Sequence, residues 1–163
     1  MDESTDGGVS IGFPPTPAAQ NLYDTAKSLL GKSLYDVLNP TVPEEYGCAA
    51  SLSFVLRAAG YKIPLQGIDT VNGIIAWLLA NGWIEQSAPL PGYVITAHSP
   101  EIAVTTGAHT GLCLIYGVGS NNSATGIFDE HFSSYQMWNT EFSTEGSVTR
   151  YFAPPNATPS SQN

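Results

Sequence analysis

Apolar residues recur at helical spacing in three segments of the first half of the chain. These segments are 18–30, 48–59 and 68–80. Each is followed by Gly or Asn-Gly, residues that commonly end helices. Asp69 or Thr70 is suitably placed to cap the third segment at its N-terminus. We therefore predict three helices, the second of which begins at or just before Cys48.

The pattern changes after Trp83. Short runs of β-branched and aromatic residues then alternate with clusters of Gly, Pro, Asn and Ser, which is typical of strands joined by turns. The predicted strands are 93–96, 110–116, 125–129 and 150–152. Helices followed by a run of antiparallel strands predict an α+β fold, with the N-terminal helices packed on one side of a central antiparallel β-sheet.

The proline-rich ends of the chain lack this periodicity. Residues 1–17 end in Phe13-Pro14-Pro15-Thr16-Pro17, and residues 154–163 are rich in Pro, Ser and Asn. Such compositions disfavour helix and sheet interiors. We predict flexible tails at both ends and one domain over 18–153, because 163 residues with 42% hydrophobic content suffice for a single core. Tails of this kind indicate a module that is joined to additional domains or to a partner protein.

Charge and hydropathy exclude two broad classes of partner. Fourteen Asp and Glu against five Lys and Arg give a formal net charge of −9, so the average surface repels a nucleic-acid backbone. No apolar run reaches the roughly 18 residues that span a bilayer. The start, Met1-Asp2-Glu3, is acidic where a secretory signal is basic and then apolar. We expect no nucleic-acid partner, no membrane anchor and no visible signal peptide.

The two cysteines and three histidines show no spacing typical of a metal site. Cys48 and Cys113 cannot make a disulfide framework, although one disulfide between them is compatible with the sequence. No CxxC or HxxxH pattern is present, so zinc would need scattered ligands. We predict no metal, and interpret His98 and His131 as solvated loop histidines.

Cys48 has the position of a nucleophile. It follows Gly47 at the start of the second predicted helix, where unpaired backbone N–H groups and the helix dipole stabilise a thiolate. A nearby imidazolium lowers a thiol pKa further. The alternative is a small buried hydrophobic residue, because free cysteine is among the most buried residue types.

His109 is the candidate base because it opens the strand 109–116. Alternate strand residues share a face, so His109, Gly111 and Cys113 point one way. Gly111 leaves room for a helix to approach, which would bring Cys48 against the His109 ring. Cys113 lies deeper on that face, where core packing explains it better than catalysis.

A cysteine–histidine pair needs a third polar group to orient the imidazole. If 109–116 and 123–129 pair as a hairpin, Asn121 or Asn122 lies beside the His109 strand. The alternative is that Gly119-Ser120-Asn121-Asn122-Ser123 is an ordinary turn. Asn121 is the first choice and Asn122 the second.

Three motifs resemble a known family when they are taken in order. The first runs from Tyr46 to Pro64 and contains Cys48 followed by Phe54-Val55-Leu56-Arg57-Ala58-Ala59-Gly60. The others are Leu90-Pro91-Gly92-Tyr93 and Ala108-His109-Thr110-Gly111-Leu112. Together they resemble the NlpC-like and CHAP-like murein hydrolases, papain-like cysteine enzymes of bacteria and their phages. The resemblance covers residues 20 to 152.

The resemblance implies a papain-like fold and assigns roles to several residues. Cys48 matches the nucleophile and His109 the general base, and the third polar residue of the family falls near Asn121 or Asn122. A tyrosine upstream of the nucleophile often helps to build the oxyanion site, and Tyr35 or Tyr46 matches it. The chain departs from the family at three positions, where Gly47 replaces Asp or Asn, Tyr93 replaces Asp, and Ala108 replaces Gly.

The resemblance also implies a substrate. We expect hydrolysis of an amide bond in peptidoglycan, by an endopeptidase of the stem peptide or an N-acetylmuramoyl-L-alanine amidase, without a cofactor. Such an enzyme acts in the periplasm or the extracellular cell wall, and we expect it to be a monomer. The alternatives are a non-catalytic module that binds cell wall or a partner, and a cysteine amidase with a non-murein substrate.

Overall fold

The computed structural model describes residues 9–101, 108–144 and 146–156. Its helices are α1 (Pro17–Leu29), the 3-10 helix η2 (Glu44–Tyr46), α2 (Cys48–Ala58), α3 (Val71–Ala80) and α4 (Tyr135–Thr144). Its strands are β1 (Lys32–Ser33), β2 (Ile84–Gln86), β3 (Val94–His98), β4 (His109–Cys113), β5 (Val118–Asn121), β6 (Ile127–Phe132) and β7 (Val148–Ala153). This content confirms the predicted α+β class.

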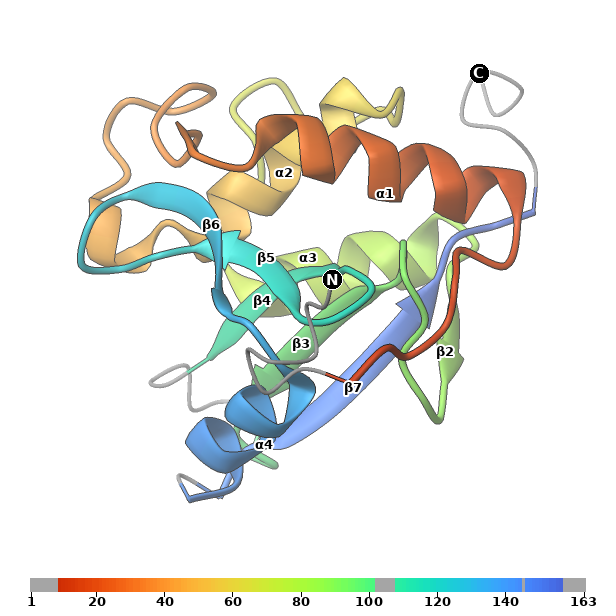
Figure 1. The fold of residues 1–163 in the computed structure, drawn as a ribbon. Coiled ribbons are helices and arrows are strands. Elements are labelled where there is room, and N and C mark those ends of the chain that lie inside the picture. Colours follow the sequence, from red (N-terminus) through yellow and green to blue (C-terminus); the bar gives the residue numbers. More distant parts are fainter. Residues whose placement is uncertain (1–8, 102–107, 145, 157–163) are drawn as a thin grey trace.

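One antiparallel sheet has helices on both of its faces. Its strand order is β1-β6-β5-β4-β3-β7-β2. Helices α1, α2 and α3 pack on one face, where Val94 and Leu112 belong to the main hydrophobic core. On the other face, Trp138 of α4 packs with Ile95 and Cys113 in a second, smaller core. Figure 1 shows α4 on the opposite side of the sheet from α1 and α2.

Helices α1, α2 and α3 confirm the helix prediction, and their ends are built as expected. The Thr70 side chain caps α3 by accepting a hydrogen bond from the backbone N–H of Gly73. Gly31, directly after α1, has a φ of +90°, which glycine adopts without the steric penalty of a Cβ. The sequence pattern therefore placed the helix that begins at Cys48 correctly.

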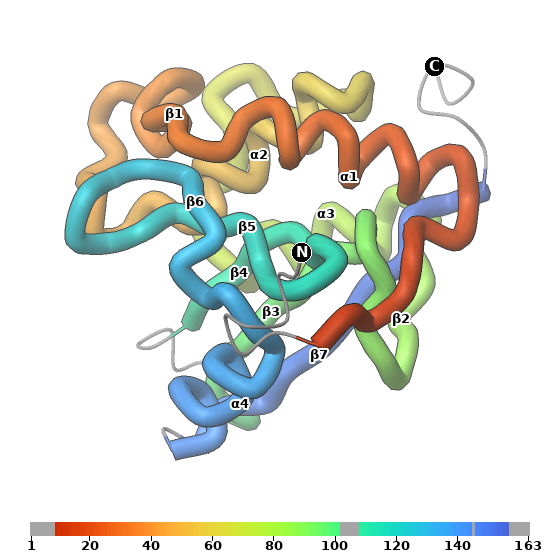
Figure 2. The backbone as a smooth tube through the Cα atoms, viewed as in Figure 1, coloured from red at the N-terminus to blue at the C-terminus, as the bar shows by residue number. Residues whose placement is uncertain are grey.

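The strand prediction is wrong between residues 114 and 126. The predicted strand 110–116 ends at Cys113, after which the Leu114 N–H donates to the Gly117 carbonyl in a tight turn. Residues 118–121, predicted as a turn, form β5, which pairs with β4 on one side and β6 on the other. Figure 2 follows the backbone through these three strands. Segments 109–116 and 123–129 therefore do not pair directly, because β5 lies between them.

Three elements carry too little pattern to be predicted. Helix α4 buries only Trp138 and Phe142, so it lacks the broad apolar stripe by which an amphipathic helix is recognised. Strands β1 and β2 have two and three residues, all of them exposed, at the two edges of the sheet. Such short exposed strands show no alternation of apolar and polar residues.

The domain begins before residue 18, inside the predicted N-terminal tail. The Ile11 N–H donates to the Ile115 carbonyl at 3.0 Å, and Pro17 is already in α1, with Thr16 as its cap. Residues 1–8 and 157–163, which make up the outer parts of both predicted tails, lie outside the described residues. Within the described ranges, no helix is long and apolar enough to cross a membrane.

Candidate active site

Cys48 is the first residue of α2, with its thiol beside backbone N–H groups. The amides of Thr110, Ala49 and Cys48 itself interact with the sulfur and lower its pKa. Burial has the larger effect and raises the Cys48 pKa above its ordinary value. The resting group is therefore a neutral thiol rather than the thiolate expected from the helix position alone.

Gly47 is required by the way the chain enters α2. A Cβ at residue 47 would overlap the Cβ of Tyr35 and lie 3.2 Å from Nδ2 of Asn121. The aspartate or asparagine common in the family that this chain resembles has no room here. Tyr35 packs behind the helix start, since its ring also lies where a Cβ of Gly126 would be. Tyr35 is not among the residues that line the pocket in front of Cys48.

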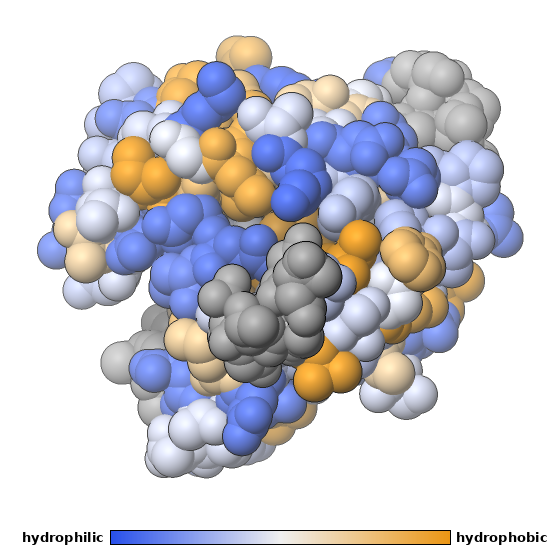
Figure 3. Space-filling model, viewed as in Figure 1, coloured by the Kyte–Doolittle hydropathy of each residue, from blue (hydrophilic) through white to orange (hydrophobic). Residues whose placement is uncertain are grey.

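A pocket of about 220 Å³ brings most of the predicted site residues together. It is lined by Glu45, Tyr46, Cys48, Asp69, Thr70, Val71, Asn72, Ala108, His109, Asn121 and Ser123. Cys48 and His109 thus face one cavity, with Tyr46 at its rim, where it is 72% exposed. The lining carries two carboxylates and, among the described residues, no Lys or Arg. Figure 3 shows hydrophilic side chains gathered over β5 and β6, where the surface is hollowed toward α4.

The imidazole of His109 lies among aromatic rings. Phe132, Trp138 and Phe142 have ring centroids 5.6 to 5.7 Å from it, and the Phe142 ring is nearly parallel to it. Burial lowers the pKa of His109 to about 3, and the positive charge available to His131 adds to this effect. His109 is therefore neutral at physiological pH and free to accept a proton.

The prediction for Gly111 is wrong, although the shared face of His109, Gly111 and Cys113 is correct. That face packs on α4, as the position of Cys113 in the smaller core shows. A Cβ at Gly111 would overlap Gly119 and Val118 of β5, so the missing side chain makes room for the neighbouring strand. Helix α2 packs on the opposite face, and Cys48 reaches β4 through the backbone of Thr110.

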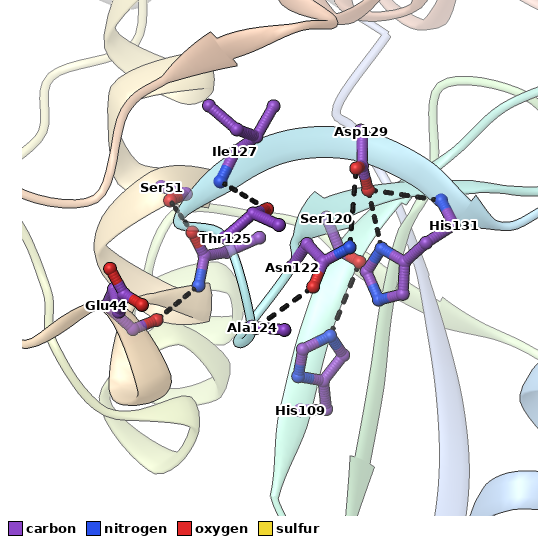
Figure 4. Close-up of polar contacts among 11 residues, drawn as sticks. Glu44, Ser51, His109, Ser120, Asn122, Ala124, Thr125, Ile127, Asp129 and His131 are labelled. Carbon is purple, nitrogen blue, oxygen red and sulfur yellow. Dashed lines mark hydrogen bonds and ion pairs between the residues drawn. The ribbon is translucent and has the colours of Figure 1, made fainter.

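Ser120, not Asn121 or Asn122, contacts the His109 ring. The Ser120 Oγ lies 3.3 Å from Nε2 of His109, as Figure 4 shows. The reason is the true register, because β5 turns Ser120 toward the α4 face and Asn121 toward α2. The orienting contact assigned to the two asparagines is therefore corrected to Ser120.

Both asparagines have other hydrogen bonds. Nδ2 of Asn121 donates to the Glu44 carbonyl at 2.8 Å, and its Oδ1 accepts from Ser51 of α2. Asn121 thus ties β5 to the entrance of α2 and lines the pocket. Oδ1 of Asn122 accepts from the Ala124 N–H in a turn, and its Nδ2 donates to Asp129.

The remaining cysteine and histidines lie elsewhere. Cys113 is fully buried in the smaller core, and burial raises its pKa to about 12. Both cysteines are free, so the disulfide that the sequence left open is not formed. His98 belongs to β3 and is 7% exposed, which makes its assignment to a solvated loop wrong. His131 belongs to β6 and pairs with Asp129.

Sequence reasoning missed Ser120, the aromatic rings around His109 and the Asp129–His131 pair. Only the alternation of β5 could have indicated Ser120, and that strand was interpreted as a turn. Within the described part of the chain, no three His, Cys, Asp or Glu residues are grouped to hold a metal.

No protein-family model, curated protein or solved structure matches this chain. The function must therefore be argued from the chemistry of the pocket.

Proposed function

We propose that this protein is a papain-like cysteine hydrolase that cleaves an amide bond of peptidoglycan. The supporting observation is that Cys48, the first residue of α2, and His109, the first of β4, line one pocket. A cysteine at a helix start and a histidine at a strand start, lining one cavity, are the two groups that acyl transfer requires. The choice of peptidoglycan rests on the resemblance of the motifs around these two residues.

Proton transfer between two neutral groups starts the proposed reaction. In this mechanism Ser120 accepts a hydrogen bond from Nε2–H of His109, whose nitrogen lies 3.3 Å from the Ser120 Oγ. Nδ1 is then unprotonated and accepts the proton of the Cys48 thiol across the pocket that both residues line. Burial disfavours each charge separately, but the thiolate and imidazolium attract each other once both have formed. The pair expected from the sequence, a thiolate already facing an imidazolium, is thus replaced by general-base activation.

The following steps use the same groups. The thiolate attacks the amide carbonyl, and the backbone N–H of Cys48 stabilises the oxyanion at the start of α2. The His109 imidazolium then protonates the leaving amine, which departs and leaves an acyl-enzyme. His109, again neutral, takes a proton from water, which hydrolyses the thioester and restores the thiol. This chemistry requires no cofactor.

A binding module is the second candidate, because the raised pKa of Cys48 gives it little thiolate at rest. Alkylation by iodoacetamide separates the two functions. Because Cys113 is fully buried, the informative comparison is between Cys48 of the wild type and Cys48 of His109→Ala. In an enzyme, Cys48 of the wild type reacts much faster near neutral pH, since His109 removes its proton. Equally slow reaction of Cys48 in both proteins would favour the binding module.

Product analysis on purified peptidoglycan tests the proposed function and identifies the bond. An endopeptidase releases stem-peptide fragments with new amino termini, whereas a muramoyl-alanine amidase releases whole stem peptides from the glycan. We expect one of these two product sets by mass spectrometry. Undigested peptidoglycan, combined with cleavage of another amide substrate, would instead indicate a non-murein amidase.

A further inference from the structure

Polar side chains form a row across three strands on the α4 face of the sheet. Ser120 of β5 contacts His109 of β4 and is the antiparallel partner of Asp129 on β6. Asp129 in turn binds His131, two residues further along β6. Figure 4 shows the His131 ring next to Ser120 and above the ring of His109. The row thus connects the candidate base to a second histidine.

His131 is held firmly by a carboxylate. Its Nδ1 lies 2.7 Å from Oδ1 of Asp129, and its backbone N–H donates to the same oxygen at 3.2 Å. The other oxygen, Oδ2, accepts from Asn122 at 3.4 Å. The side chains of His131 and Asp129 are 29% and 34% exposed. The His131 ring therefore keeps a fixed place while part of it stays open to solvent.

The fixed place of His131 is close to the candidate base. The two imidazole centroids are 6.4 Å apart, with the ring planes 78° from parallel. The other groups on this face are the uncharged rings of Phe132, Trp138 and Phe142, and the β3 residue opposite His109 is Ala97.

Three more titratable groups line the pocket that His109 also lines. They are the Cys48 thiol and the carboxylates of Glu45 and Asp69, which line the same cavity. Glu45 and Asp69 are exposed, so water screens their charges. On the α4 side, His131 is the charged group that acts on the pKa of His109, and Asp129 binds His131.

We propose that His131, held by Asp129, is a positioning residue whose charge controls how readily His109 accepts the proton of Cys48. This inference rests on the proposed function. With His131 neutral, the pair carries the single negative charge of Asp129, which favours an imidazolium at His109. Protonation of His131 cancels that charge. At 6.4 Å, one unit of charge changes the proton affinity of His109 on the order of tenfold to a hundredfold.

The pH dependence of the rate separates this role from a merely structural one. Because burial keeps the pKa of His109 near 3, a fall in kcat/KM well above pH 3 must come from another group, and we assign it to His131. In His131→Asn, which keeps a donor for Asp129 but cannot gain a charge, we expect the acid limb to disappear. In Asp129→Asn we expect the plateau itself to fall about tenfold, because the favourable charge is lost.

Glu130→Gln is the matched control. It removes a carboxylate from the same strand, but Glu130 interacts with Lys27 and Tyr23 of α1 rather than with His109. We expect its pH profile to match the wild type. The inference would be overturned if kcat/KM of His131→Asn fell at acid pH as it does in the wild type. It would also be overturned if Glu130→Gln removed this fall to the same extent.

Nuclear magnetic resonance provides a readout that needs no substrate. The chain has only three histidines, so each ring can be followed from pH 8 down to about pH 2, past the pKa of about 3 of His109. We expect His109 to begin titrating about one pH unit higher in His131→Asn than in the wild type. Identical His109 titrations would contradict the inference even if peptidoglycan is cleaved. If peptidoglycan is not cleaved, the proposed function fails. The titration still shows whether the charge of His131 acts on His109.

Discussion

At Ser120 a single hydroxyl contacts the His109 ring at Nε2. A hydroxyl can donate or accept a hydrogen bond, so the contact holds the ring in place with the proton on either ring nitrogen. Ser120 is 1% exposed, so water does not compete for this hydrogen bond. The aromatic rings packed around the imidazole of His109 also restrict its rotation.

Ser120→Ala is therefore expected to lower kcat/KM about tenfold without abolishing the reaction. The hydroxyl orients the ring and transfers no proton itself. Asn121→Ala tests the role assigned from the sequence and is expected to act through the entrance of α2, by lowering stability. Steady-state kinetics and urea denaturation of both variants would show this division. A larger kinetic loss in Asn121→Ala than in Ser120→Ala would return the orienting role to Asn121.

The places of Cys48 and His109 in the fold could be predicted from the sequence, but their surroundings could not. Cys48 follows a glycine at a helix start and His109 opens a strand, and both are local signals. The contact between His109 and Ser120 depends on the pairing of two strands. A slip of one residue turns every side chain to the other face. For this reason the prediction placed Asn121 beside His109, where the structure has Ser120.

Among the elements, the junction between η2 and α2 determines the position of Cys48. Gly47 ends η2 and precedes Cys48, and the Tyr35 side chain occupies the space where a Cβ would lie. Asn121 ties the same junction to β5 through the Glu44 carbonyl. The helix start is thus fixed by packing on one side and by a hydrogen bond on the other.

Gly47→Ala is expected to destabilise the fold by roughly 1–3 kcal/mol, because the new methyl group forces the Tyr35 backbone or the helix start to move. The loss should be smaller in a Tyr35→Gly background, where the overlapping Cβ is absent. A double-mutant cycle by urea denaturation measures the coupling. Strictly additive effects of the two changes would show that the overlap is not what requires glycine.

The elements that the sequence predicted are those with a strong local period. Helices α1, α2 and α3 present apolar stripes to the main core. Strand β5 was interpreted as a turn because Gly119-Ser120-Asn121 has the composition of one, although its place in the sheet buries it. Tertiary pairing overrides weak strand propensity in this case.

For the whole molecule, the half-buried and neutral His109 makes stability depend on pH. The unfolded chain binds a proton at this residue below about pH 6.5, whereas the folded chain does so only near pH 3. Stability must therefore fall as the pH decreases between these values, by up to roughly 1.4 kcal/mol per pH unit. Cys48 and Cys113 lower the stability at alkaline pH. Their pKa values are raised in the folded chain, so their thiols ionise more readily when the chain unfolds.

Urea denaturation at pH 7 and pH 5 checks the acid side. We expect the wild type to lose roughly 2 kcal/mol more than His109→Gln over this interval, because the variant has no proton to take up at residue 109. The comparison of two losses cancels the direct cost of the substitution. Equal losses in the two proteins would mean that His109 is not held in its neutral form by burial.

The release of new amino groups from purified peptidoglycan is the most direct test of the central claim, that Cys48 and His109 form a hydrolytic site. The wild type and two single cysteine variants, Cys48→Ala and Cys113→Ala, would be compared after circular dichroism has shown that all three are folded. We predict release by the wild type and by Cys113→Ala, and none by Cys48→Ala. Undiminished release by Cys48→Ala would contradict the account.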